Sequence, residues 1–452
     1  MSDGVPMQNE TLELARLESL IAEVLDEAKK QGASAAEAGL SADRGLSVSV
    51  RLGEVETIEH HRSQGLGVTV YFGQRKGSAS TTDLRLEALR ETVAAACRIA
   101  QYAAEDEFAG CPDEELLAKE FPDLDLYHPW DLDVEGAIAL ALECENAARE
   151  FHPAITNSEG ASVNTYQGLR VLGNSLGFLH GYASSRHSLS CSVIGQRGDS
   201  MQRDDWWTVA RDAGDLESAG QVGRKAAERA VRRLDARTLS TRQCPVVFAA
   251  DVAGGLLGHF IGAIRGGNLY RKSSFLLDCL GKQVFPAFIH LHEEPHLPKA
   301  LGSAPYDSDG VATYPHDLVA DGILKCYVLS TYSARKLGLK TTGNSGGVHN
   351  LILDPGELDL PGLLKKMGTG LLVSELMGQG VNLVTGDYSR GASGFWVENG
   401  EIQYPVDEIT IAGNLRDIYL KILAVGRDVD LRGNIRTGSI LVEEMTVAGQ
   451  GG

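Results

Sequence analysis

Apolar residues recur with two different spacings near the start of the chain. In residues 10–32 they return every three or four positions up to Gly32, which predicts an amphipathic helix. Apolar and polar residues then alternate in three short segments, GLSVSVRLG, EVETIEHHRS and GLGVTVYFG. Turn residues separate these segments, so they predict an antiparallel meander.

Helix and strand patterns return before residue 240. Two amphipathic helices are predicted over residues 83–106 and 131–151, and an acidic, proline-containing loop separates them. An alternating run over residues 158–198 predicts further strands, and a fourth helix is expected over residues 216–234. The first half is therefore expected to combine helices with an antiparallel sheet.

The second half has a different pattern. A polar stretch leads into an apolar strand at Val246, and beyond it lie short strands, glycine-rich turns, one apolar helix after Asp251 as its N-cap, and a helix near residues 360–366. Since 452 residues exceed one ordinary core, two domains are predicted. The expected class is α+β, with an N-terminal domain at 1–240 and a β-rich, barrel- or sandwich-like domain at 241–452.

Composition narrows the classes of function. The formal net charge of −19 opposes binding to DNA phosphates and to anionic membranes. The polar, acidic N-terminus does not resemble a signal peptide, and no run of 18 apolar residues occurs. The seven cysteines form no C-x-x-C pair, which is typical of reduced thiols. A cytoplasmic location is therefore predicted.

The segment IHLHEEPHLP spells H-E-x-x-H at His292, Glu293 and His296, the signature of zinc proteases. That motif needs a helix, in which two histidines four residues apart share a face. Pro295 opposes a helix, and the preceding residues alternate as in a strand. A strand with a solvated His/Glu face, comprising His290, His292 and Glu294, is favoured over a zinc site.

Two G-x-S-x-G segments, at residues 173–177 and 343–347, resemble the nucleophile elbow of serine hydrolases. The first joins two alternating segments and the second leads into a strand-like one, whereas an elbow lies between a strand and a helix. Turns are therefore favoured over nucleophiles. The sequence contains no Walker A motif and no G-x-G-x-x-G that opens a helix.

Two further segments have candidate functions. The apolar helix after residue 251 carries His259, which is more typical of a core or interface residue than of a ligand. Residues 385–415 combine turn residues with Phe395, Trp396 and Tyr404. A hairpin with a packed aromatic pair is favoured, and a loop that faces a substrate or partner is the alternative.

This last segment, together with GLLGHFIGAIRGGNLYRKSSFL, APYDSDGVAT and KTTGNSGG, resembles the TldD/PmbA family, and more closely its PmbA (TldE) branch. The resemblance covers nearly the whole chain. It implies a cytoplasmic metalloprotease system in which TldD and TldE form a heterodimer that cleaves small or unfolded peptides. Maturation of a peptide antibiotic and degradation of an antitoxin are implied, and an older family label is modulator of DNA gyrase.

The TldD branch carries H-E-x-x-x-H after a Leu-Leu pair, with both histidines and a C-terminal cysteine on zinc and the glutamate as general base. In this sequence Gly258, His259 and Ala263 stand at the three motif positions, and no cysteine follows Cys326. Catalytic zinc needs three protein ligands and an open position. The resemblance therefore implies a chain that binds no zinc alone and has no catalytic residues of its own.

The favoured function is a non-catalytic subunit that completes or gates a zinc-containing TldD-type partner. Two alternatives stay open: a metalloprotease in its own right, with metal held by His259 and the cluster His290, His292 and His296, or a non-proteolytic regulator. An isolated chain could form a homodimer. A peptide could add as a strand in a groove, for which the candidate residues are Asp387, Ser389, Arg390, Phe395 and Trp396.

Overall fold

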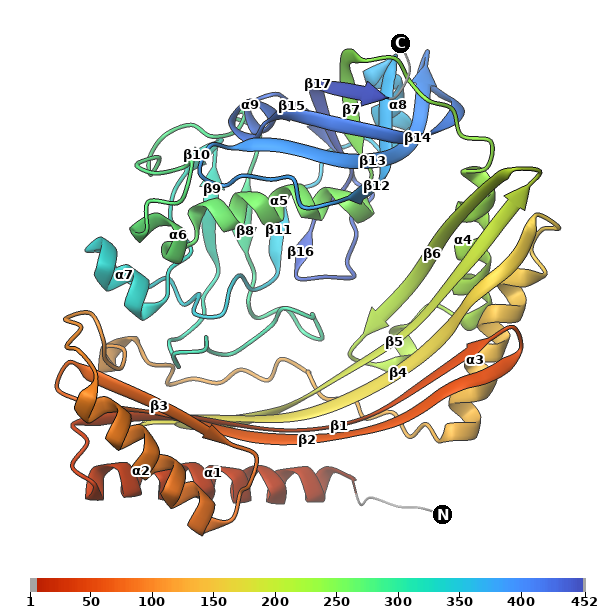
Figure 1. Cartoon of the computed structure of the whole chain (residues 1–452). Coiled ribbons are helices and arrows are strands. Elements are labelled where there is room, and N and C mark those ends of the chain that lie inside the picture. The colour runs from red at the N-terminus through yellow and green to blue at the C-terminus, as the bar shows by residue number, and fades with distance from the viewer. Residues whose placement is uncertain (1–5, 450–452) are drawn as a thin grey trace.

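The protein, described by a computed structural model over residues 6–449, has two parts that face each other (Figure 1). A long curved sheet with helices on its outer face forms the first part, and a barrel with a smaller sheet forms the second. The predicted α+β class is confirmed. Residues 1–5 and 450–452, which the predicted N-terminal stretch and domain ranges include, lie outside the described residues.

The first sheet is antiparallel throughout, in the order β3-β2-β1-β4-β5-β6. Its strands are long and curve as a half-barrel around the second part (Figure 1). The strands are β1 (Ala35–Arg51), β2 (Glu54–Phe72), β3 (Arg75–Thr81), β4 (Ile155–Asn174), β5 (Leu179–Arg197) and β6 (Ser200–Ala210).

Two helix pairs cover the outer face because the central strands β1 and β4 each have two apolar stretches. In β1, Ala36 and Leu40 pack under one pair, and Leu46 and Val50 pack under the other. These even-numbered positions share a face, as the period of two in a strand requires. The pairs are α1 (Pro6–Lys30) with α2 (Leu86–Tyr102), and α3 (Val134–Arg149) with α4 (Ala219–Arg232).

The predicted meander is wrong in one respect. EVETIEHHRS and GLGVTVYFG form one strand, β2, and not two. Gly65 and Gly67 lie in its interior, opposite Ser41 and Gly39 of β1. Strand pairing on both sides of β2 satisfies the backbone there, and this outweighs the turn preference of glycine.

The second part contains a closed five-stranded barrel, β14-β13-β12-β7-β17, in which β14 pairs with β17. A smaller sheet has the order β10-β9-β8-β11-β16. The barrel strands are β7 (Arg242–Phe248), β12 (Gly370–Met377), β13 (Asp387–Glu398), β14 (Glu401–Asn414) and β17 (Ile440–Gly449), with β15 (Ile422–Val425) beside β17. The smaller sheet contains β8 (Leu291–Glu293), β9 (His316–Ala320), β10 (Ile323–Leu324), β11 (Leu351–Leu353) and β16 (Ile435–Arg436).

Helix α5 (Ala250–Ile264) lies in the core between barrel and small sheet (Figure 1). Its apolar residues Leu256, Leu257 and Phe260 are fully buried, which explains its nearly all-apolar sequence. The shorter helices are α6 (Gly266–Tyr270), α7 (Thr331–Leu337), α8 (Leu360–Met367) and α9 (Leu415–Leu420). None of the helices within residues 6–449 has the length and apolar character that crossing a membrane requires.

The connection from α4 to β7 contains the predicted domain boundary at residue 240, which stays a prediction. Arg237 already pairs with Val406 of β14, and Leu239 packs in the core of the second part. The chain therefore enters the second part a few residues before position 240.

Candidate functional site

Helix α5 follows directly from β7, a strand in the wall of the barrel. Its N-cap is Ala249, so the prediction that Asp251 caps the helix is wrong. Asp251 lies in the first turn and accepts a 2.8 Å hydrogen bond from Arg229 Nη1 on α4. Arg229 Nε also bonds to Asp204 of β6 at 2.9 Å. One guanidinium thus joins the long sheet to the start of α5.

The three motif positions on α5 have different surroundings. A Cβ at Gly258 would have Ile435 Cδ1 as its nearest neighbour, at 4.0 Å, whereas Ala263 is 0% exposed in the core. On a regular α-helix, side chains five residues apart point about 140° apart. Positions 258 and 263 therefore face different directions on α5.

The imidazole of His259 is half-buried against β13. Its ring centroid lies 5.9 Å from that of Tyr388 in an edge-to-face arrangement. Burial, and then the positive charge of Arg390, lower the pKa of His259. Its Nε2 is buried and has no hydrogen-bond partner among the described residues. His259 is thus held neutral beside a cation.

A cleft of about 340 Å³ lies between β6 and α5. Asp251, Val252 and Gly255 of α5 form one wall, and strands β12 and β13 contribute Glu375 and Arg390. The facing wall comes from the first part of the protein: Asp204, Asp205, Trp206 and Trp207 of β6, and Arg229 of α4.

Arg432 lies against the aromatic wall of this cleft. Its guanidinium carbon is 3.9 Å from the ring centroid of Trp206 and 4.8 Å from that of Trp207. It donates to the carbonyl of Trp207 at 3.1 Å and to Asp430 at 2.8 Å. A backbone carbonyl on the free edge of β6 is therefore already occupied.

The residues that were predicted to form a groove lie in different places in the structure. Arg390 lines the cleft, whereas Asp387 and Ser389 are exposed. Phe395 and Trp396 are buried in two different apolar clusters. Successive residues of a strand point to opposite faces, so Phe395 and Trp396 do not pack against each other, and Trp396 instead lies opposite Tyr404 of β14. The hairpin itself is confirmed, as β13 and β14.

The three zinc ligands that the resemblance implies do not fit the residues present on α5. The motif positions supply one imidazole and no carboxylate, and Arg390 is the charged group beside that imidazole. A catalytic zinc site needs three ligands from the protein.

The literal H-E-x-x-H residues do not converge either. Glu293 is 1% exposed and accepts hydrogen bonds from Asn344 Nδ2 and from the backbone N–H of His349. His296 Nε2 lies 3.0 Å from the hydroxyl of Thr313. The strand reading describes the segment better, although β8 itself covers only Leu291–Glu293.

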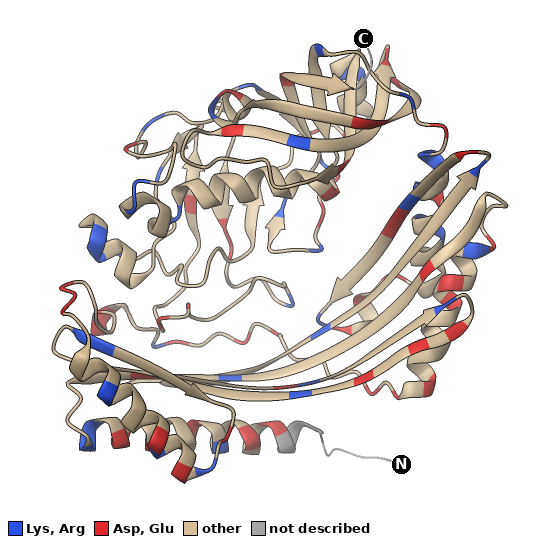
Figure 2. Ribbon diagram, viewed as in Figure 1, with Lys and Arg blue, Asp and Glu red and all other residues tan. Residues whose placement is uncertain are grey.

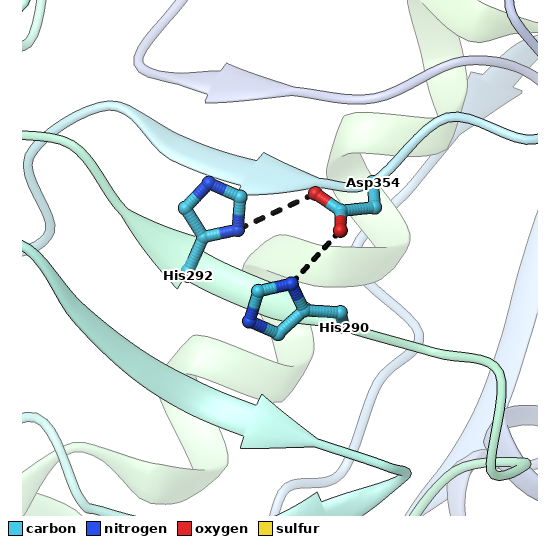
Figure 3. Close-up of side chains that lie close together, drawn as sticks. All are labelled: His290, His292 and Asp354. Atoms are coloured by element: carbon cyan, nitrogen blue, oxygen red, sulfur yellow. Dashed lines mark hydrogen bonds and ion pairs between the residues drawn. The ribbon is translucent and has the colours of Figure 1, made fainter.

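His292 instead lies beside His290 and Asp354 (Figure 3). Among residues 6–449, these three are the group of His, Cys, Asp and Glu side chains whose ligand atoms are spaced to hold a metal ion, all within 4.8 Å of one another. His259 has other neighbours, Tyr388 and Arg390. The sequence interpretation missed Asp354 because its place beside His290 depends on how β8 and β11 pair.

Both G-x-S-x-G segments form turns. Ser175 lies between β4 and β5, and its hydroxyl accepts a bond from the N–H of Ala36 at 3.0 Å. The hydroxyl of Ser345 donates to the carboxylate of Asp309 at 2.7 Å. Each serine thus has a structural contact.

A curved antiparallel sheet joined to a barrel, with a helix directly after a barrel strand, is shared with a known class of proteins. Sequence profiles of PmbA/TldA metallopeptidases match domain 1 at residues 36–100, the central domain at 127–234 and the C-terminal domain at 241–449. The chain belongs to the PmbA/TldD metallopeptidase family.

Its relatives are similar along nearly their full length. Metalloprotease PmbA of Escherichia coli O157:H7 is 53% identical over 92% of each chain. The Metalloprotease PmbA homolog of Haemophilus influenzae is 50% identical over 98% of this chain and 99% of that one. A solved structure from Bacteroides thetaiotaomicron, described as a proposed modulator of DNA gyrase, has a TM-score of 0.91 at 29% identity and covers 96% of this chain and 98% of its own.

Proposed function

We propose that this chain is the non-catalytic, PmbA/TldE-type subunit of a peptide-hydrolysing system whose zinc lies in a TldD-type partner. One observation carries the proposal: α5 presents Gly258, His259 and Ala263 at the motif positions. A neutral imidazole beside Arg390 cannot replace three ligands and a general base.

The cleft between β6 and α5 supports a role in holding peptide. Its wall combines two tryptophans with several arginines and carboxylates, groups that contact both side chains and backbone of a peptide. Strand β6 is the end strand of its sheet. A peptide that adds to β6 would first displace Arg432 from the Trp207 carbonyl.

The proposed setting is the cytoplasm, with no role for nucleic acid or membrane. All seven cysteines are free thiols, as expected in a reducing compartment. Acidic and basic residues are interspersed along the outer helices and long strands (Figure 2). Nucleic-acid binding instead requires a continuous basic surface. An isolated chain could form a homodimer through the face that meets its partner.

Reconstitution tests the proposal. The chain and a TldD-type chain are purified separately, mixed, and assayed for co-elution and for hydrolysis of short unfolded peptides. We expect no hydrolysis by this chain alone and faster hydrolysis by the mixture than by the TldD-type chain alone. The His259→Ala variant is a control, because any zinc binding or hydrolysis by this chain that requires His259 would be lost in it.

Two other outcomes would replace the proposal. Hydrolysis by the pure chain that is lost in His259→Ala would identify a metalloprotease in its own right. The unpartnered Nε2 of His259 is the observation that favours this second candidate. Failure to bind any TldD-type chain would instead favour a non-proteolytic regulator, and the Bacteroides structure is described as a proposed modulator of DNA gyrase.

A further inference from the structure

Three side chains on the small sheet point toward one another, away from α5 (Figure 3). His290 Nδ1 lies 2.8 Å from Asp354 Oδ2, and His292 Nδ1 lies 3.4 Å from Asp354 Oδ1. The two imidazole rings are stacked, with centroids 4.7 Å apart. Two nitrogens and a carboxylate thus face one small volume.

The strand register holds these groups in place. In the antiparallel pair β8–β11, Leu291 is opposite Leu353, and the N–H of Asp354 donates to the carbonyl of His290 at 3.1 Å. Asp354 is therefore the cross-strand neighbour of His290 on the same face, and His292 is two residues further along that face. Backbone pairing, and not a mobile loop, sets the distances.

The outer nitrogens of both rings face carboxylates. His290 Nε2 lies 2.8 Å from Asp317 Oδ1 on β9, which is a hydrogen-bond distance, whereas His292 Nε2 lies 4.0 Å from Glu294 Oε1, which is too long for one. Metal-binding histidines commonly donate their second N–H to a carboxylate, which fixes the tautomer that leaves the other nitrogen free to bind. His292 Nδ1 is buried and has no hydrogen-bond partner among the described residues.

We propose that His290 Nδ1, His292 Nδ1 and the carboxylate of Asp354 bind a divalent transition-metal ion of the kind that imidazole prefers, with Zn²⁺ as the first candidate. Around a tetrahedral zinc at about 2.0–2.1 Å, ligand atoms lie about 3.3 Å from one another. The observed separations of 2.8 and 3.4 Å require shifts of less than about 1 Å. Imidazole ligands disfavour Mg²⁺ and Ca²⁺, which take oxygen.

The three ligands leave a position open to solvent, since the side chains of His290 and Asp354 are 36% and 46% exposed. The ion would join β8 to the residue that follows β11 and would stabilise this sheet by binding the folded state. The site is separate from α5 and does not depend on the proposed role of the chain. The proposal differs from the expectation that this chain alone binds no metal, and that expectation stays a prediction.

Equilibrium dialysis of the full, chelator-treated chain against ZnCl₂ tests the proposal, and MgCl₂ serves as the comparison. We expect one Zn²⁺ per chain, a higher Tm with Zn²⁺ and no such effect of Mg²⁺. The His292→Ala and Asp354→Asn variants should bind at least about 100-fold more weakly, and Asp317→Asn about 10–100-fold more weakly. Binding by His259→Ala and His296→Ala should stay unchanged.

The experiment still tests the proposal if one of the variants folds poorly. Absence of stoichiometric Zn²⁺ binding by the wild-type chain overturns the proposal, because it means that the imidazoles and carboxylates only pair with one another. Binding that survives in both His292→Ala and Asp354→Asn, or that is lost in His259→Ala, also overturns it. Circular dichroism of each metal-free variant identifies any loss due to unfolding, and Asp317→Asn then provides the independent measurement.

Discussion

The carboxylate of Asp251, in the first turn of α5, accepts a 2.8 Å hydrogen bond from the guanidinium of Arg229 on α4. The side chains are 19% and 25% exposed, so solvent screens this pair only in part. This ion pair connects α5, the helix with the three motif positions, to α4 on the long curved sheet. This ion pair therefore helps to hold the two walls of the cleft together, along with the Arg233–Glu375 pair at 2.6 Å.

Replacing Asp251 with asparagine should destabilise the protein by about 1.5–3 kcal/mol, because a half-buried guanidinium loses a charged partner. Calorimetry measures the change. Glu444→Gln is the matched control, since Glu444 pairs with Lys421 at an exposed position and its loss should cost about 0–1 kcal/mol. Equal effects of the two substitutions would contradict a special role for the Arg229 pair.

The pH dependence of stability should reflect the neutral state of His259. Burial and the charge of Arg390 lower its pKa in the folded chain, so its contribution to stability is present above the unfolded pKa of about 6.5. That contribution is lost as the pH falls through the folded pKa. Comparing Tm of wild type and His259→Gln from neutral to acid pH isolates this contribution from those of other histidines.

Arg390→Met should raise the pKa of His259 toward its ordinary value, because the positive charge is removed while much of the side-chain bulk remains. A histidine-labelled sample followed by NMR reports the titration directly. A pKa of His259 at or above its ordinary value in the wild-type chain would show that the imidazole is not kept neutral.

Restoring family ligands one at a time should affect stability unequally. Ala263→His places an imidazole where the side chain is 0% exposed and should destabilise by about 1–3 kcal/mol through overpacking. Gly258→His has room for its Cβ and should stay within about 1 kcal/mol of wild type. Urea unfolding of both variants checks the difference, and a larger loss of stability in Gly258→His than in Ala263→His would contradict these surroundings.

Two hairpin glycines provide a test of the turn geometry. Gly400 has φ +79°, and a Cβ there would lie 2.7 Å from Lys365 Cα, so Gly400→Ala combines strain with a backbone clash. Gly177 has φ +95° but no atom within 4 Å of the added Cβ. Gly177→Ala should cost about 1–3 kcal/mol from strain alone, and Gly400→Ala clearly more. Thermal unfolding that ranks them in the opposite order would contradict this geometry.

Periodicity predicted α1 to α5 and α8 because each of them buries a single apolar face or is wholly buried, whereas the short helices α6, α7 and α9 were not predicted. The fourth helix was expected at residues 216–234 and is observed as Ala219–Arg232. The hairpin at Asn399 and Gly400 was also predictable, because this residue pair readily adopts the positive φ that a tight turn requires. The same reasoning failed at Gly65 and Gly67, where pairing with β1 continues the strand.

The candidate site on α5 likewise has features that the sequence shows and features that only the fold shows. Gly258, His259 and Ala263 are evident in the sequence, and so is the lack of a second imidazole among them. The partners of His259 are not evident from the sequence, because Tyr388 and Arg390 lie more than a hundred residues away in the chain. Strand β13 of the barrel places them beside His259. Their proximity results from long-range strand pairing, which local patterns do not encode.

The segment IHLHEEPHLP separates the two kinds of information most clearly. Its own residues exclude the helical H-E-x-x-H site, because Pro295 and the alternation of apolar residues are local properties of the chain. Its relation to Asp354 is a property of the fold, since antiparallel pairing of β8 with β11 brings together residues 64 positions apart. Local sterics act within a few residues, whereas strand register depends on how distant segments bury their apolar faces together.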